Sequence, residues 1–395
     1  MVPLGAAETK SIIIGGLAAS RHAGQADYRG LADVKNRKFI DGGGVPNRYA
    51  QLISVEDIMN LSLRLGGFCF FLFLSQACQD SGNPVLQTPP ETYHFDSTLP
   101  WEQSKDAEGV NITALCVVSD AAGNSRILAG SWTGIFGSMD NGRTWMHSNI
   151  GLADTAISAF AFQATMVYTG TDRNGVFRST DYGSSWIPSS NGMTGRYVTD
   201  LLTTPDGYLF ASTNGSGIFA SSNNGTTWAP VDSGLGSQIV YTIAATTDML
   251  NRTSLFAGTF ERGIFLSSNC GSVWQPANNG LASPTVEALA IGDNGAFAGT
   301  YDCIYRSTNN GFAWVAMNNG LSHTAISDIC VLQDHIVVAT AGAGVFLSTN
   351  NGANWSPQNF GLPTDYVFCL AVSRHNSNGH TLFAGTNNGI WKHAL

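Results

Sequence analysis

Ser138-Met139-Asp140-Asn141-Gly142-Arg143-Thr144-Trp145 is a stretch whose close copies return at a nearly constant interval to the end of the chain. Five more copies begin at a serine and end at a tryptophan: Ser179 to Trp186, Ser221 to Trp228, Ser267 to Trp274, Ser307 to Trp314 and Ser348 to Trp355. Successive tryptophans lie 41, 42, 46, 40 and 41 residues apart. Repeats of about 40 to 45 residues are typical of the four-stranded blades of a β-propeller.

Each unit contains four short apolar runs, and the second and third are the most regular. The second run reads ILAGS, VYTGT, LFAST, LFAGT, AFAGT, VVATA and LFAGT, and the third reads GIFGS, GVFRS, GIFAS, GIFLS, CIYRS, GVFLS and GIWKH. These runs are rich in β-branched and aromatic residues and are bounded by Gly and Asn, which indicates strands. Seven copies of each run predict an all-β fold, with one seven-bladed propeller over residues 99–395.

The fourth strand of each unit carries the tryptophan of the repeated stretch. Only six such strands occur, against seven second strands and seven third strands. The last unit stops at Leu395, just after its third strand. A segment of the same form, Pro100 to Lys105 (PWEQSK), precedes the first inner strand. We therefore expect this amino-terminal strand, within residues 99–104, to complete the carboxy-terminal blade and remove the open edges of the ring.

The repeated stretch, called the box below, has a local structural explanation. Asp or Asn at its third position can accept backbone hydrogen bonds in the hairpin between strands three and four. The glycine at its fifth position supplies the positive φ of the turn. A catalytic or metal-binding box is the alternative, but four of the six positions carry Asn, which is a poor base. The predicted structural residues are Asp140, Gly142, Trp145, Asp181, Gly183, Trp186, Trp228, Trp274, Trp314 and Trp355.

The beginning of the chain predicts export. An apolar run from Leu65 to Leu74 follows Arg64 and is too short to span a bilayer, so residues 59–78 read as a signal peptide. Met59 is the expected start, which leaves 1–58 as a gene-model extension or a disordered segment; a cytoplasmic extension ahead of an internal signal is the alternative. Cys78 ends a lipobox-like segment and is a lipidation candidate. Residues 79–98 predict a flexible tether.

Charge limits the partners. The chain has a formal net charge of -9, and from residue 79 onward 22 Asp and Glu face 11 Lys and Arg. A surface this poor in cations is unsuited to a phosphate backbone, so we expect no nucleic-acid partner. No phosphate-binding loop and no metal-ligand spacing occur, and we expect no cofactor and no metal. We also expect a monomer, held at a membrane only through the lipid at Cys78 and placed in the cell envelope or secreted.

The boxes resemble the Asp-box (BNR) repeat, S-x-D-x-G-x-x-W, of sialidases, xyloglucan-type glycoside hydrolases, sortilin-like receptors and photosystem II assembly factors. The resemblance covers residues 99–395 and implies the propeller fold. It leaves the function open, because one fold hosts many activities. The combination of LFAGT, GIFxS and NNGxxW motifs also resembles secreted or cell-surface bacterial propellers without assigned chemistry.

The sialidase resemblance implies a site that the sequence does not supply. Sialidases carry an Arg-Ile-Pro element and three arginines that hold the substrate carboxylate, whereas the nearest segment here, Arg126 to Leu128, lacks the proline. Asp200 and Asp328 are the carboxylates at equivalent inner-strand positions, with Glu287 one residue out of step. Glycosidases need two carboxylates about 5 to 9.5 Å apart, a separation not expected for blades three and six.

We therefore expect a non-catalytic module that binds protein or glycan, with a sialidase-type glycoside hydrolase as the alternative. The loops between strands two and three lie on the face opposite the boxes and vary between blades. Variable aromatic and charged side chains on a rigid scaffold commonly form binding sites. The candidate binding residues are Trp132, Asp172, Arg173, Glu261, Arg262, Tyr301 and Asp302.

Overall fold

The computed structural model describes residues 71–72, 93, 95–119, 125–248, 253–321, 325–333, 335–363, 366–375 and 379–395. These residues fall in a compact unit that spans Phe70–Leu395. The predicted segment 1–58, most of the predicted signal peptide, most of the predicted tether and Cys78 lie outside the described residues.

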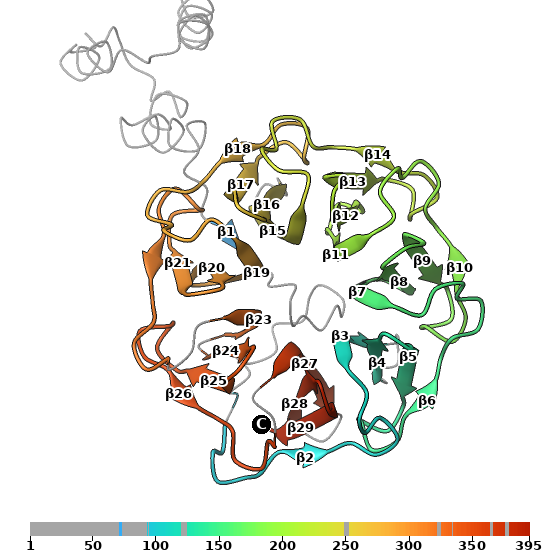
Figure 1. Cartoon of the computed structure of the whole chain (residues 1–395), viewed down its shortest axis with the longest axis vertical. Coiled ribbons are helices and arrows are strands. Elements are labelled where there is room, and N and C mark those ends of the chain that lie inside the picture. Colours follow the sequence, from blue (N-terminus) through green and yellow to red (C-terminus); the bar gives the residue numbers. More distant parts are fainter. Residues whose placement is uncertain are drawn as a thin grey trace, which may run out of the picture. The chain divides into compact units, whose positions relative to one another are not determined.

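The unit is an all-β ring of seven antiparallel blades, as predicted, and each inner strand contacts the inner strands of the two neighbouring blades (Figure 1). The blades, numbered in chain order, are: blade 1, β3 (Ile112–Ser119), β4 (Ser125–Ser131), β5 (Gly134–Ser138) and β6 (Met146–His147); blade 2, β7 (Ile157–Gln163), β8 (Met166–Thr171), β9 (Val176–Ser179) and β10 (Ile187–Pro188); blade 3, β11 (Val198–Thr203), β12 (Leu209–Thr213), β13 (Ile218–Ser221) and β14 (Ala229–Pro230); blade 4, β15 (Val240–Asp248), β16 (Thr253–Thr259), β17 (Gly263–Ser267) and β18 (Gln275–Pro276); blade 5, β19 (Val286–Gly292), β20 (Gly295–Thr300), β21 (Ile304–Ser307) and β22 (Val315–Ala316); blade 6, β23 (Ile326–Leu332), β24 (His335–Thr340), β25 (Gly344–Ser348) and β26 (Ser356–Pro357); blade 7, β27 (Val367–His375), β28 (Gly379–Thr386), β29 (Gly389–Ala394) and β2 (Glu102–Gln103). A further two-residue strand, β1 (Phe71–Leu72), falls within the predicted signal segment and pairs with the end of β15.

Ring closure by the amino-terminal strand is confirmed. β2 pairs antiparallel with β29, with Glu102 opposite Lys392, and the two side chains form an ion pair of 3.6 Å. Trp101 is buried beside this strand, and its indole Nε1 donates to the carbonyl of Gln358 at 2.6 Å. Its backbone N-H donates to the carbonyl of Phe360 at 2.8 Å, as those of the box tryptophans of blades 2 to 6 do to equivalent residues before them. Trp101 thus plays the part of a seventh box tryptophan.

The hydrophobic core consists of seven clusters, one between each pair of neighbouring blades. In the cluster between blades 1 and 2, Leu128 and Ile135 of blade 1 pack with Phe177 and Trp186 of blade 2. The indole of Trp186 also donates to the backbone of Ser148 in blade 1 at 2.8 Å. Each tryptophan therefore fastens its blade to the one before it, and truncating such a buried side chain typically destabilises by about 3 to 5 kcal/mol.

The box hairpins satisfy their hydrogen bonds internally. Asp140 accepts the backbone N-H groups of Arg143 and Thr144 at 3.0 and 2.9 Å and the Thr144 hydroxyl at 2.6 Å. Although partial desolvation acts in the opposite direction, these bonds hold the pKa of Asp140 at about 2. Gly142 has a φ of 75°, and Asn141 before it has 56°, so two successive residues adopt the left-handed conformation.

The last described residues of the predicted tether pack on blade 7. Tyr93 and Phe95 join the hydrophobic cluster between blades 6 and 7. The Phe95 ring stacks on His393 with centroids 4.4 Å apart, and the Tyr93 ring lies 4.6 Å from that of His380. The ordered propeller therefore begins before the closing strand.

Candidate binding site

A β-bulge at the start of every inner strand shapes the centre of the ring. Between the inner strand and the second strand, the register shifts at the same place in all seven blades. Bulges re-aim side chains and are frequent near functional sites. The bulged residues, called the bulge ring, are Thr113, Ser158, Thr199, Tyr241, Glu287, Ser327 and Phe368.

Three hydroxyl members of the bulge ring join neighbouring blades. Thr113 donates to the carbonyl of Ile157 at 2.6 Å, and Thr199 donates to Val240 at 2.5 Å. Ser327 likewise donates to the backbone of blade 7 at 2.5 Å. In blades 4, 5 and 7 the bulge ring instead carries the larger side chains of Tyr241, Glu287 and Phe368.

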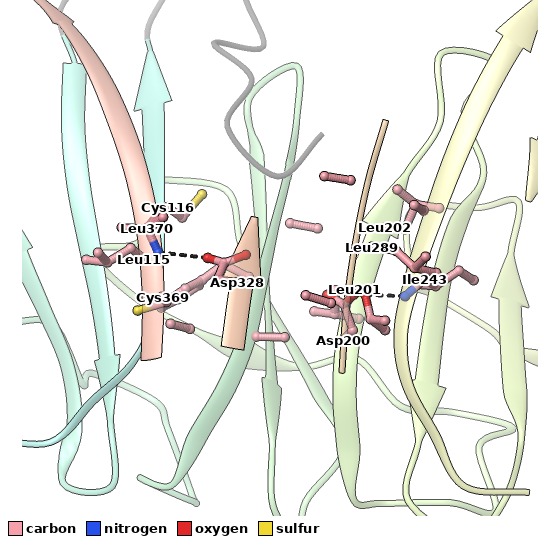
Figure 2. Close-up of a pocket in the computed structure, with 18 of the residues that line it drawn as sticks. Leu115, Cys116, Asp200, Leu201, Leu202, Ile243, Leu289, Asp328, Cys369 and Leu370 are labelled. Carbon is pink, nitrogen blue, oxygen red and sulfur yellow. Dashed lines mark hydrogen bonds between the residues drawn. The ribbon is translucent and has the colours of Figure 1, made fainter. Parts of the chain in front are cut away.

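The seven inner strands enclose a central cavity of about 360 Å³, which all members of the bulge ring line. Asp200 of blade 3 and Asp328 of blade 6 lie in its wall (Figure 2). Asp200 accepts hydrogen bonds from the N-H of Ile243 in blade 4 at 3.0 Å and from Leu201 at 2.8 Å. Asp328 accepts from Leu370 in blade 7 at 2.7 Å and from Ile329. Both carboxylates thus bind their own strand and the next blade.

The same two carboxyl groups are poorly solvated. Burial raises the pKa of Asp200 to about 6, although its backbone hydrogen bonds act in the opposite direction. Burial raises the pKa of Asp328 to about 7, with a further contribution from the charge of Asp200. Because each group is held by two backbone N-H donors, the geometry gives both a role in joining blades.

A second cavity of about 390 Å³ opens from the bulge ring toward the face opposite the boxes, and we call it the mouth cavity. Its wall contains Trp132 from the hairpin between strands two and three of blade 1 and Asp172 from the equivalent hairpin of blade 2. Tyr197, Tyr241 and Glu287 line it as well. The mouth cavity therefore combines three aromatic rings with two carboxylates, drawn from five blades.

Electrostatic contacts link these side chains. Partial burial, the charge of Asp172 and a hydrogen bond to it raise the pKa of Tyr197. Partial burial and the charges of Glu287 and Glu261 raise the pKa of Tyr241. Glu287 is exposed to the solvent of the cavity, but protein surrounds it on several sides, and this partial desolvation raises its pKa. An arc of carboxylates and phenols thus runs across blades 2 to 5.

The predicted binding residues divide into two groups. Trp132 and Asp172 line the mouth cavity, whereas Arg173, Glu261, Arg262, Tyr301 and Asp302 are exposed outside its wall. Glu261 still lies close enough to Tyr241 to act on its pKa, and its backbone adopts a positive φ of 58°. Among these residues the structure thus brings together the hairpins of blades 1 and 2.

Sequence reasoning missed Tyr197 and Tyr241, and it considered Glu287 only as a catalytic candidate. The bulge positions could have been found by aligning the inner strands of the seven repeats. The bulged residue is the one that follows the first Ile or Val of each inner strand. Four of the seven blades carry Ser or Thr there, so Tyr241, Glu287 and Phe368 stand out once the repeats are aligned.

The described residues include no helix long and apolar enough to cross a membrane. In the same part of the chain, no group of three His, Cys, Asp or Glu side chains is arranged so that it could hold a metal ion.

Comparisons with known proteins show the fold alone. No protein-family model matches the sequence, and no curated protein matches it. Among solved structures, YCF48 bound to D1 peptide is similar with a TM-score of 0.57 and 14% identity, over 77% of this chain and 98% of that one. At this identity the similarity establishes the propeller architecture.

Two other similar structures belong to larger proteins. The extracellular domain of BT4673 from B. thetaiotaomicron is similar with a TM-score of 0.55 and 17% identity, over 74% of this chain and 39% of that one. The GH74 xyloglucanase from Xanthomonas campestris is similar with a TM-score of 0.53 and 15% identity, over 74% of this chain and 53% of that one. This chain thus spans well under two thirds of either protein, and the fold occurs in a peptide-bound protein, an extracellular domain and a glycosidase.

Proposed function

We propose that this protein is an exported, non-catalytic propeller that binds a protein partner through the mouth cavity. The observation that carries the proposal is the wall of that cavity, in which Trp132, Tyr197 and Tyr241 surround an open space of about 390 Å³. Trp132 is 64% exposed and Tyr197 is 43% exposed, although burial of aromatic side chains is the ordinary expectation. Exposed aromatic residues around a concave surface are typical anchors of protein interfaces.

The rest of the chain supports this reading. The repeated boxes and hydroxyl bonds make a rigid frame, and the variable hairpins of blades 1 and 2 stand on it, as in other sites built from loops on a scaffold. YCF48, a propeller of similar fold, has been solved with a bound peptide. The predicted signal peptide and lipidation candidate Cys78 would place the mouth cavity outside the cytoplasm, where its partner would be an envelope or extracellular protein.

A random peptide library displayed on phage tests the proposal with the purified full chain as bait. We expect enriched peptides that the wild type retains and that the double variant Trp132→Ala, Tyr241→Ala loses by about tenfold or more. Tyr301→Ala is the matched control, because Tyr301 is 71% exposed but lies outside the wall of the mouth cavity. Equal capture by wild type and double variant would contradict the proposal.

A glycosidase is the second candidate, and one observation favours it. Tyr241 lies within electrostatic range of Glu287, and Asp172 shares their cavity, so the residue types of the sialidase nucleophile pair and acid meet in one place. The described part of the wall contains no arginine that could hold a substrate carboxylate. Fluorogenic sialoside and glucan panels test this candidate: turnover lost in Glu287→Gln would favour the enzyme.

A further inference from the structure

The walls of the two central cavities carry charge of one sign. Asp172, Asp200, Glu287 and Asp328 line them, and among the described residues neither wall contains lysine, arginine or histidine. Arg173 and Arg262 follow acidic residues on the same face, but they lie outside both walls. Clefts lined by one sign of charge with low-dielectric walls concentrate field lines, so the mouth cavity attracts cations.

The aromatic residues of the mouth cavity are an independent feature that suits the same ligand. A cation over the face of Trp or Tyr is attracted by the ring quadrupole, and the attraction increases when water is excluded. Trp132, Tyr197 and Tyr241 provide such rings, and Asp172 and Glu287 provide carboxylates in the same wall. Aromatic rings combined with carboxylates suit an organic cation better than a neutral group.

The dimensions also fit a side chain. A cavity of about 390 Å³ lies in the range of small-ligand pockets, and it opens to the surface. It continues into a second cavity of about 360 Å³, and Tyr241 and Glu287 line both. A long, flexible side chain that ends in a charge can pass the aromatic rim and place its head at the level of Glu287.

We propose that the mouth cavity recognises a cationic side chain, arginine or lysine, of the protein partner, with Glu287 as its counter-charge and Trp132 and Tyr241 as its aromatic walls. The inference rests on the proposed function, because it names the chemistry of the ligand at that same site. Burial raises the pKa of Glu287, and a cation bound beside it would act in the opposite direction.

Trp132 supplies a direct readout. The chain has nine tryptophans; Trp132 is 64% exposed, whereas the other eight are no more than 8% exposed. Its fluorescence therefore reports on the mouth cavity while the others report on the core. Trp132→Phe, which keeps an aromatic ring, should remove the signal and identify its source.

The experiment titrates the purified full chain with a capped pentapeptide of one arginine among glycines. Matched peptides contain citrulline, lysine or acetyl-lysine, so that shape is kept while charge is removed. We expect a saturable change in emission with arginine or lysine and binding at least about tenfold weaker with the neutral partner. Raising the salt concentration from about 0.05 M to about 0.5 M should weaken binding several-fold.

Variants identify the counter-charge. Glu287→Gln should weaken binding of the cationic peptide by about tenfold or more. Asp206→Asn, which removes an exposed carboxylate from the loop between β11 and β12, is the matched control and should bind as the wild type does. Equal binding of arginine and citrulline peptides, no saturable response, or full binding by Glu287→Gln would each overturn the inference.

The library selection separates this inference from the proposed function. Peptides that depend on Trp132 and Tyr241 but show no enrichment of arginine or lysine would overturn the cationic ligand and leave a protein-binding mouth cavity in place. Loss of that dependence would contradict both.

Discussion

Asp328→Asn should remove the pH dependence that this carboxyl group imposes on stability. In the folded protein the pKa of Asp328 is about 7, against an ordinary value of 3.8, because burial and the charge of Asp200 disfavour the ionised form. The folded state therefore binds more protons than the unfolded state between these two values. The contribution of Asp328 to the free energy of unfolding then falls as pH rises from about 4 to about 7 and is constant above that range.

The magnitude follows from the two pKa values. A difference of about 3 pKa units at about 1.4 kcal/mol each gives about 4 kcal/mol for Asp328, and Asp200, with a pKa of about 6, gives about 3 kcal/mol. These are upper limits, because the charge of Asp200 contributes to the raised pKa of Asp328, so the two contributions are not independent. We expect the pair to lower the free energy of unfolding by several kcal/mol between about pH 4.5 and about pH 8.

Asparagine at position 328 changes both the hydrogen bonds and the charge of the side chain. Asp328 accepts one backbone N-H at each oxygen, from Ile329 and from Leu370, and an amide offers one oxygen only. Asp328→Asn therefore loses one hydrogen bond, worth about 1 to 2 kcal/mol, at every pH. Because the variant also removes the ionised carboxylate, it should be less stable than the wild type at pH 5 and equally or more stable at pH 8.

Urea denaturation at the two pH values, followed by the emission of the buried tryptophans, measures the effect. Asp200→Asn should show the same crossover with smaller amplitude. Asp140→Asn is the control, because the pKa of Asp140 is held at about 2 and this group affects the pH dependence of stability only below about pH 4, so the variant should keep the wild-type slope between pH 5 and pH 8. If Asp328→Asn and Asp200→Asn both kept the wild-type change of stability between pH 5 and pH 8, the two carboxylates would not be the cause of that change.

Three further tests address closure, packing and processing. A chain that begins at Val110 should melt well below one that begins at Gln79, because it lacks β2 and Trp101; equal melting temperatures would refute closure. Trp186→Phe should lose about 1 kcal/mol more than Trp145→Phe, because the Trp186 indole donates to Ser148 and that of Trp145 has no partner among the described residues; denaturant midpoints decide this. Mass spectrometry should find a mature chain that begins at or after Cys78, which a peptide from Arg29 to Lys35 would contradict, and palmitate labelling lost in Cys78→Ser would identify a lipoprotein.

Much of the fold was predictable because each blade repeats the same local chemistry. The box fixes a hairpin, its tryptophan fixes the contact with the preceding blade, and one missing fourth strand implied closure by the segment around Trp101. Box glycines such as Gly142 adopt the expected positive φ. In each case a short sequence decides a local structure, and the repetition makes the pattern visible.

The bulge could not be predicted in the same way. A bulge adds one residue to a strand and changes which side chains line the central cavity. The apolar run that marks the strand in the sequence remains the same. Glu287 therefore seemed merely out of step with Asp200 and Asp328, when it occupies a different structural position that all seven blades share. Tyr197 was missed because it lies in a connection between blades, where no periodicity applies.

The bulge ring also explains why one side of a nearly symmetric ring can form a site. Three hydroxyl members are committed to hydrogen bonds with the next blade, and substitution there would remove a contact between blades. At Tyr241 and Glu287 the position has a long side chain, and these two members stand in adjacent blades. The hairpins that carry Trp132 and Asp172 line the same space. Where a repeat protein departs from its own pattern at neighbouring positions, stability of the scaffold does not require the change, so ligand binding is the better physical account.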